Sequence, residues 1–249
     1  MFKHNHTSTS FATQRGISLI EIMVAITISL ILLAGISQIF LSSKTSYNLQ
    51  DGMGRLQENA RYALDVLNRS VGMAGYTESI TPIDAFNTTN TQDNVSTNSD
   101  LDFTVANGKA SDVIEVNYTS ATDCLGNATG GQATDRFYIN GSDLMCLGNG
   151  SNTPGIMAEG VENMQILYGE DTDNDNTANH YVSVGNVVDW TAVVSVRIAL
   201  LVSTVQSVGS NTTDNKTHVL LNATPIGPIG DSVIRRVFSR TIILRNTIT

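Results

Sequence analysis

Three aspartates at alternate positions form the densest group of potential metal ligands in the sequence. They are Asp171, Asp173 and Asp175, in the segment Gly-Glu-Asp-Thr-Asp-Asn-Asp-Asn-Thr at residues 169–177. Alternating oxygen ligands of this kind occupy positions 1, 3 and 5 of a calcium loop, where Thr177 would offer the position-7 carbonyl and Asn179 position 9. Hard oxygen ligands favour Ca²⁺ over zinc. The pattern therefore predicts Ca²⁺ as a candidate cofactor.

This segment departs from the calcium loop at two positions. Asn176 replaces the glycine of position 6, and Val182 replaces the bidentate glutamate of position 12. Asparagine tolerates the left-handed backbone, so the first change is mild. The second change predicts a weaker site, or one completed from elsewhere in the protein. The alternative interpretation is a solvated acidic turn between two strands.

Residues that could support catalysis are scarce. After residues 1–16 the only histidines are His180 and His218, and both stand in polar surroundings without a serine or cysteine motif nearby. A general base normally needs such a partner within hydrogen-bond reach. Gly130 and Gly131 predict a turn rather than a phosphate-binding loop. We therefore expect no catalytic residues and no enzymatic activity.

A second chemical pattern lies near the N-terminus, where Arg15 and Gly16 precede Ile17 and Glu21. A cut between Gly16 and Ile17 would leave a new amine on Ile17, four residues before Glu21 and so one helical turn away. That amine would be a cation able to pair with Glu21, or with the same carboxylate of a neighbouring copy. Such an ion pair would explain the presence of Glu21, because an acidic side chain in a transmembrane helix costs about 3 kcal/mol.

The element that carries Glu21 is a long predicted helix. Residues 17–41 contain no other charged residue, and as a helix they would span about 37 Å, enough for a bilayer core of about 30 Å. We expect residues 17–43 to form this membrane or filament-core helix and residues 44–75 to continue it as an amphipathic helix that ends at Gly72 and Gly75. Its apolar stripe comprises Leu49, Met53, Leu56, Ala60, Ala63, Leu67 and Val71. A cleaved secretory signal would be shorter and end in an A-x-A-like site, and a plain signal anchor would have no use for Glu21.

The rest of the chain, residues 76–249, has the pattern of a β-rich globular domain. Strands are predicted at residues 112–118, 136–140, 143–147, 159–168, 193–203 and 235–245. Asn140 and Gly141 predict a type I′ hairpin turn, and the polar tract at residues 87–100 predicts a long surface loop. The fold class is therefore α+β, with a long N-terminal helix packed against a C-terminal antiparallel sheet.

Charge distribution indicates where the two ends of the chain lie. Residues 1–16 hold Lys3 and Arg15 and no acid, whereas the 249-residue chain carries a net charge of −9. The basic flank stays in the cytoplasm, so we expect an N-in topology with a periplasmic C-terminal domain. The acidic balance argues against a nucleic-acid partner. In that oxidising compartment Cys124 and Cys146 are expected to form one disulfide, the alternative being two free thiols.

Together, Gly16, the apolar Ile17, Glu21 and the long apolar run resemble the class III signal of type IV pilins. That resemblance implies that a prepilin peptidase cuts after Gly16 and methylates Ile17, and that Glu21 docks the subunit into a growing filament. Further segments resemble the PilW family of minor pilins, namely residues 55–64, 73–76, 161–165, 168–173, 194–201, 236–238 and 244–246. Many PilW relatives carry a cysteine where this chain has Thr77 and Glu78, which puts a second disulfide in doubt.

The PilW resemblance implies a low-abundance subunit that primes type IV pilus assembly and resides at the pilus tip. Its implied partners are other minor pilins, the major pilin, the prepilin peptidase, a large tip adhesin and the inner membrane. One alternative is a J-like pseudopilin of type II secretion. Another is a membrane-anchored calcium-dependent binding module that never polymerises, which Glu21 argues against.

Overall fold

The computed structural model describes residues 16–95, 97–98, 103–104, 110–207 and 213–246. The predicted leader therefore lies outside the described residues, apart from Gly16. The chain divides into two compact units, Met1–Tyr47 and Asn48–Thr249, and each is described by itself. Its elements are α1 (Leu19–Gly72), β1 (Gln92–Val95), β2 (Thr97–Asn98), β3 (Phe103–Thr104), β4 (Ser111–Thr122), β5 (Ala128–Asn140), β6 (Asp143–Gly148), β7 (Gly155–Glu159), β8 (Val161–Glu170), β9 (His180–Val182), η2 (Val184–Asn186), η3 (Trp190–Ala192), β10 (Val193–Ser203) and β11 (Arg235–Ile243).

In the first unit α1 is a helix of almost uninterrupted apolar residues. Some of its hydroxyl groups bond within the helix: Thr27 Oγ1 donates to the Met23 carbonyl at 2.9 Å and Ser37 Oγ to the Leu33 carbonyl at 2.8 Å. These hydroxyl protons therefore need no water. Among the described residues, α1 is long and apolar enough to cross a membrane by length and composition.

In the second unit the end of α1 packs on the β-rich part of the chain. The predicted stripe is buried from Leu56 to Val71, whereas Leu49 remains 38% exposed and Met53 is partly exposed. The buried residues recur at spacings of three and four, which keeps them on one helix face. The helix ends at Gly72 as predicted, and Gly75 follows with a positive φ of 76°.

Two antiparallel sheets form the body of this unit. One has five strands in the order β1-β4-β5-β6-β7, and the other has four in the order β11-β10-β8-β9. A separate pair, β2-β3, lies between β1 and β4 in the sequence. The predicted α+β class and the long N-terminal helix are confirmed, with two main sheets where one was expected.

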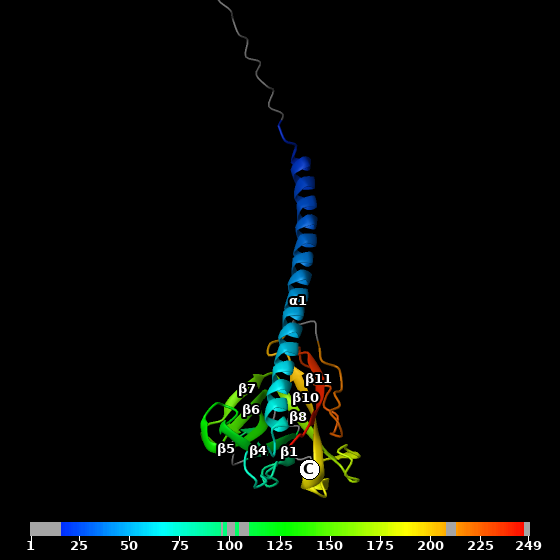
Figure 1. The fold of residues 1–249 in the computed structure, drawn as a ribbon. Coiled ribbons are helices and arrows are strands. Elements are labelled where there is room, and N and C mark those ends of the chain that lie inside the picture. The colour runs from blue at the N-terminus through cyan, green and yellow to red at the C-terminus, as the bar shows by residue number, and fades with distance from the viewer. Residues whose placement is uncertain (1–15, 96, 99–102, 105–109, 208–212, 247–249) are drawn as a thin grey trace, which may run out of the picture. The chain divides into compact units, whose positions relative to one another are not determined.

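The core of the second unit is shared by the helix and both sheets. Buried apolar residues from α1, β4, β5, β6, β8, β10 and β11 belong to one cluster. Figure 1 shows the end of α1 lying across strands of both sheets. At one edge of this core, Phe86, Tyr168 and Trp190 pack ring against ring, with centroids 4.9–5.6 Å apart.

Two local predictions are wrong. The polar tract at residues 87–100 was expected to be a loop, but its Gln92–Val95 portion is strand β1, paired antiparallel with β4. An edge strand is held by backbone hydrogen bonds, so it does not need apolar side chains. The β5–β6 hairpin closes with Asn140 opposite Asp143, so its loop is Gly141-Ser142. Of these two only Gly141 has a positive φ, 62°, which is the type II′ pattern rather than type I′.

Candidate functional site

The junction between Gly16 and Ile17 lies in an exposed, non-helical segment ahead of α1. A Cβ at Gly16 would meet no heavy atom within 4 Å, and Ile17 is 72% exposed. The first helical turn forms at Ser18, whose carbonyl accepts hydrogen bonds from the N–H groups of Glu21 at 3.0 Å and Ile22 at 3.2 Å. Arg15 lies outside the described residues. Because this segment is exposed and not helical, the peptide bond between Gly16 and Ile17 is accessible to an enzyme.

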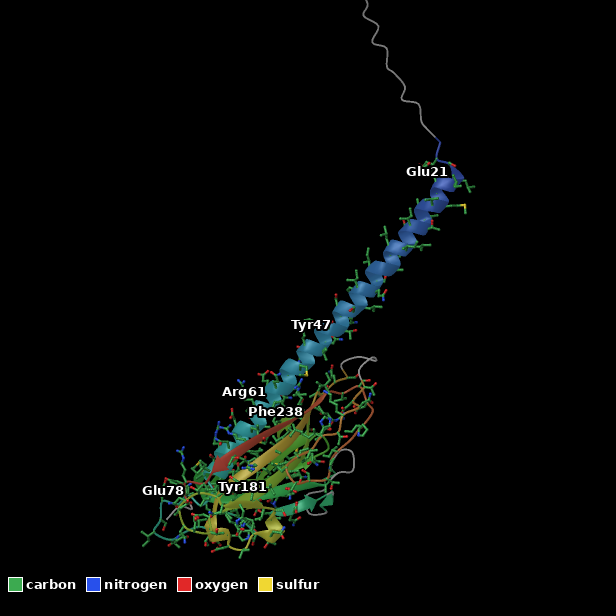
Figure 2. The ribbon with its side chains drawn as sticks, turned by 90° about the vertical axis from the view of Figure 1, so that its right-hand side faces the viewer. Glu21, Tyr47, Arg61, Glu78, Tyr181 and Phe238 are labelled. Carbon is green, nitrogen blue, oxygen red and sulfur yellow. A yellow bond between two sulfur atoms is a disulfide. The ribbon has the colours of Figure 1, made fainter. Side chains whose placement is uncertain are left out.

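Glu21 lies in the first turn of α1 and is exposed to its surroundings (Figure 2). The partial positive charge of a helix N-terminus favours a carboxylate at this place. Glu21 makes no ion pair among the described residues. Because Ile17 precedes the helix in the uncleaved chain, the segment from Ile17 to Glu21 does not form one complete helical turn.

The apolar side chains that follow Glu21 form a continuous uncovered surface. Every large apolar residue from Ile22 to Leu41 is 48–72% exposed. No second element of the first unit covers them among the described residues. A surface of this size marks a membrane or protein contact.

The predicted calcium ligands form a compact turn between β8 and β9. Single carboxylate oxygens of Asp171, Asp173 and Asp175 lie within 4.8 Å of one another. Asp171 is buried, and its carboxylate accepts backbone N–H bonds from Asp173, Asp175 and, at 2.7 Å, Asn176. Burial raises the pKa of Asp171, but these backbone donors outweigh it and hold the pKa below its usual value. The turn is therefore built around the Asp171 carboxylate.

The remaining predicted ligands have other hydrogen bonds. Asn179 Oδ1 accepts from the N–H and Oγ1 of Thr172, at 2.7 and 3.1 Å. Thr177 donates its N–H to Asp175 Oδ1 at 2.7 Å. Asn176 adopts a left-handed φ of 65°, as the replacement of glycine at this position required. The structure thus gathers three of the five predicted ligands and uses Asn179 to close the turn.

Cys124 and Cys146 form the predicted disulfide, with Cα atoms 6.6 Å apart. Beside it lies a carboxylate that the sequence did not indicate, the fully buried Asp135 of β5. Asp135 accepts hydrogen bonds from Tyr118 Oη at 2.5 Å and from the N–H of Cys124 at 2.8 Å. Burial raises the pKa of Asp135. The carboxylate fixes the backbone of the loop that carries Cys124.

A second buried polar cluster, also not predicted, surrounds Arg235 at the start of β11. Its guanidinium donates to Glu162 at 2.6 and 3.0 Å, to Asp231 at 2.6 and 2.7 Å, and to Asp214 at 3.0 Å. His218 lies 3.2 Å from the same Asp214 oxygen. An arginine that opens a strand gives no sequence signal for such a cluster, because Glu162 and Asp214 lie 73 and 21 residues away in the sequence and only Asp231 is near.

The two histidines of the described residues contact carboxylates that tie loops to strands. His180 Nε2 lies 3.0 Å from Glu170 Oε2, while the other Glu170 oxygen accepts the N–H groups of Val188 and Asp189. Burial raises the pKa of Glu170, but these hydrogen bonds outweigh burial and hold the pKa below its usual value. Among the described residues, neither His180 nor His218 forms a hydrogen bond with a serine or cysteine side chain.

Two protein-family comparisons match different parts of the chain. Residues 126–246 match the family model for type IV pilus-assembly protein W. This match covers just under half of the chain. Residues 12–37 match the prokaryotic N-terminal methylation motif, which covers Gly16, Ile17 and Glu21. The chain is thus a type IV pilin-like protein with a PilW domain, and its helix and signal motif point to membrane anchoring.

Among solved structures, a type IV-like pilin from Thermus thermophilus is similar, with a TM-score of 0.47 and 16% sequence identity. The similarity covers 78% of this chain and 98% of that pilin. No curated protein matches the chain significantly.

Proposed function

We propose that this protein is a minor pilin that helps to prime a type IV filament and resides in a tip complex with other minor pilins. The prepilin peptidase would cut after Gly16 and methylate Ile17. The helix at residues 17–43 would then pass from the inner membrane into the filament core. The C-terminal domain would face the periplasm and later the outside. The role is structural rather than catalytic.

The observation that carries this proposal is the lone carboxylate of Glu21 at the head of an uncovered apolar helix. A helix that only anchors a domain in lipid gains nothing from Glu21, which costs about 3 kcal/mol at membrane depth. A helix that packs against other subunits can recover this cost by pairing Glu21 with the new amine of Ile17 on a neighbour. The surrounding apolar side chains would supply the packing surface, and Glu21 would fix the axial position of this helix relative to its neighbours.

The implied partners follow from the same surfaces. The helix would pack against the helices of other minor pilins and of the major pilin. The exposed Gly16–Ile17 junction would be the substrate of the prepilin peptidase. A large tip adhesin would bind the exposed domain rather than the helix.

The proposal is tested by replacing Glu21 in the full chain and expressing it in a strain that lacks the native gene. We expect Glu21→Val to insert into the membrane normally and to reduce surface pili strongly, as measured by shearing and electron microscopy. The matched control is Ile22→Val, a change of similar size without loss of charge, which should restore pili. Normal piliation with Glu21→Val would contradict the docking role. Normal pili with lost protein secretion in the deletion strain would instead assign the chain to type II secretion.

A further inference from the structure

Strand β11 forms an open edge of the four-stranded sheet, because it pairs with β10 on one side only. Nine residues long, it exceeds the other edge strands of the two main sheets, β1, β7 and β9, which have four, five and three residues. The N–H of Leu244 donates to the carbonyl of Val194. Since bonded and non-bonded pairs alternate in an antiparallel ladder, the backbone groups of residues 237, 239, 241 and 243 point away from β10.

The side chains along this edge are also uncovered. Val237 is 37% exposed and Ile243 63% exposed, and Ser239 and Thr241 are exposed as well. Valine, isoleucine and threonine favour strands. A long open edge with such residues is a template for another strand, and proteins usually cover or shorten it unless it is used. Among the described residues no segment pairs with this edge.

The same edge carries positive charge in an acidic protein. Arg236 and Arg240 alternate with the open-edge residues and share the face of the buried Ile242, and Arg245 follows the strand. Arg240 pairs with Asp65 of α1 at 2.7 Å, with both side chains about half exposed. Arg236 and Arg245 make no ion pair among the described residues. The chain as a whole carries −9.

The helix α1 adds to this charge. Arg61 precedes Asn68 and Gly72 by seven and eleven residues, two and three turns, so the three share one side of the helix. Asn68 and Gly72 line a groove of about 400 Å³ together with Arg240 and Arg245. Figure 2 labels Arg61 on α1 and Phe238 on β11, and Arg61 also lines a groove with Glu58, Asp65 and Glu159. We call Arg61, Arg236, Arg240 and Arg245 the basic flank; within the described residues Asp65 is the acidic group paired with it.

We propose that β11 binds an extended acidic segment of another pilus subunit as an additional antiparallel or parallel strand. The open-edge backbone groups would supply the hydrogen bonds, as in other cases of strand addition. Residues of the added strand beside Arg236 and Arg240 would be Glu or Asp, because opposite charges stabilise cross-strand pairs. Residues beside Val237 and Ser239 would be small or β-branched. Only the identity of the partner as a pilus subunit rests on the proposed function.

A nucleic acid is the other polyanion that a basic flank could attract. The open edge favours a peptide, because its regularly spaced N–H and C=O groups match a strand and not a phosphate backbone. The net charge of −9 also repels a long polyanion.

The test uses the full-length protein in detergent and a fluorescent peptide that alternates glutamate with valine or threonine. Ser239→Pro removes one open-edge N–H and keeps the ladder to β10, and proline is accepted at such edge positions. Ser239→Ala is the matched control, because it retains the N–H. We expect Ser239→Pro to weaken peptide binding at least tenfold in fluorescence anisotropy and Ser239→Ala to leave it unchanged. Equal binding by the two variants would overturn the strand-addition proposal.

The charge requirement is tested separately. A peptide with lysine in place of glutamate should not bind, and Arg236→Glu combined with Arg245→Glu should abolish binding of the acidic peptide. Equal binding of the lysine peptide would overturn the acidic assignment. Duplex DNA is the competing ligand. If DNA binds through the same arginines, and if Ser239→Pro weakens neither DNA binding nor peptide binding, the basic flank is a general polyanion site and the proposal fails. If Ser239→Pro does not fold, as judged by loss of the native disulfide, Thr241→Pro replaces it in the test of strand addition. The double arginine variant then tests the charge requirement.

Pilus assays separate this inference from the proposed function. If Ser239→Pro loses peptide binding and also loses pili while remaining in the membrane, the partner is a pilus subunit. Lost peptide binding with normal pili would overturn the subunit as partner and leave the Glu21 test untouched. Normal pili with Glu21→Val would overturn the proposed function and leave the peptide result standing.

Discussion

Arg235 on β11 donates two hydrogen bonds to Glu162 on β8, although 73 residues separate them in the sequence. Both side chains are almost completely buried. The planar guanidinium matches the two carboxylate oxygens, which makes this pair stronger than a single-point contact. Since Arg235 also contacts Asp214 and Asp231, it ties the segment between β10 and β11 to the sheet.

Replacing Arg235 should therefore destabilise the domain strongly. Arg235→Met would leave Glu162 and Asp214 buried without the guanidinium, and breaking a buried pair in this way costs about 3–5 kcal/mol. Urea unfolding of the full chain in detergent, followed by the fluorescence of Trp190, would measure the loss. The matched control is Arg236→Met, the exposed neighbour, which should change stability by less than about 0.5 kcal/mol. A loss of similar size in both variants would contradict the role given to the buried cluster.

The same cluster predicts sensitivity to acid. Hydrogen bonds from Arg235 lower the pKa of Asp231; for Asp214 burial raises the pKa, but bonds from His218, the Lys216 N–H and Arg235 outweigh it. A carboxyl with a lowered folded pKa stabilises the fold above its unfolded pKa of about 4, and this contribution is lost as pH falls through the folded value. Stability should thus fall more between pH 5 and pH 2 in the wild type than in Arg235→Met. Asp135, whose raised pKa acts in the opposite direction, is common to both proteins and cancels in the comparison.

The parts of the fold that could be predicted are those with a local cause. The stripe from Leu56 to Val71 buries one helix face, and β10 spans the predicted range Val193–Ser203, although it is buried on both faces rather than on one. Strand β1 could not be predicted, because its place depends on the backbone of β4 rather than on its own side chains. Asp135 and the Arg235–Glu162 pair were missed for a similar reason: their partners lie on other strands, and an isolated charged residue carries no pattern.

Cleavage at Gly16 is testable in the uncut chain. Gly16→Ile should block processing, because the exposed Gly16 is the small residue that admits the peptidase at this junction. Immunoblotting should then show the longer form accumulating in the membrane, whereas Ser18→Ala should be processed normally. N-terminal sequencing of the wild type should return a methylated Ile17. A start at Met1, or a cut beyond Leu33, would refute the prepilin assignment.

The disulfide should contribute measurably to stability. Cys124 and Cys146 are separated by 22 residues, and closing a loop of that size contributes about 3 kcal/mol in the entropy model. The double change to serine should lower the urea midpoint accordingly. Mass spectrometry of exported wild-type protein without reduction should show one cross-linked peptide pair. Free thiols on both residues would contradict this prediction.

Calcium binding at the turn of Asp171, Asp173 and Asp175 stays a prediction, and the structure sharpens its test. Oxygens within 4.8 Å of one another can share one Ca²⁺, because each Ca–O contact is about 2.3–2.6 Å. Asp171 also accepts three backbone N–H bonds, so replacing it would damage the turn with or without an ion. The Asp173 carboxylate is exposed and has no hydrogen bond among the described residues, so Asp173→Ala is the cleaner probe.

We expect Ca²⁺ to raise the melting temperature of the full chain in detergent by mass action, relative to the same protein in chelator. Mg²⁺ at equal concentration should do much less, since it gives up its water reluctantly and requires stricter geometry. Asp173→Ala should remove the Ca²⁺ effect and leave the melting temperature in chelator nearly unchanged. Glu78→Ala, which removes an acid outside the turn, should keep the Ca²⁺ effect. If Ca²⁺ and Mg²⁺ shift melting equally, or if Asp173→Ala leaves the shift intact, the three aspartates form a solvated turn organised by Asp171 alone.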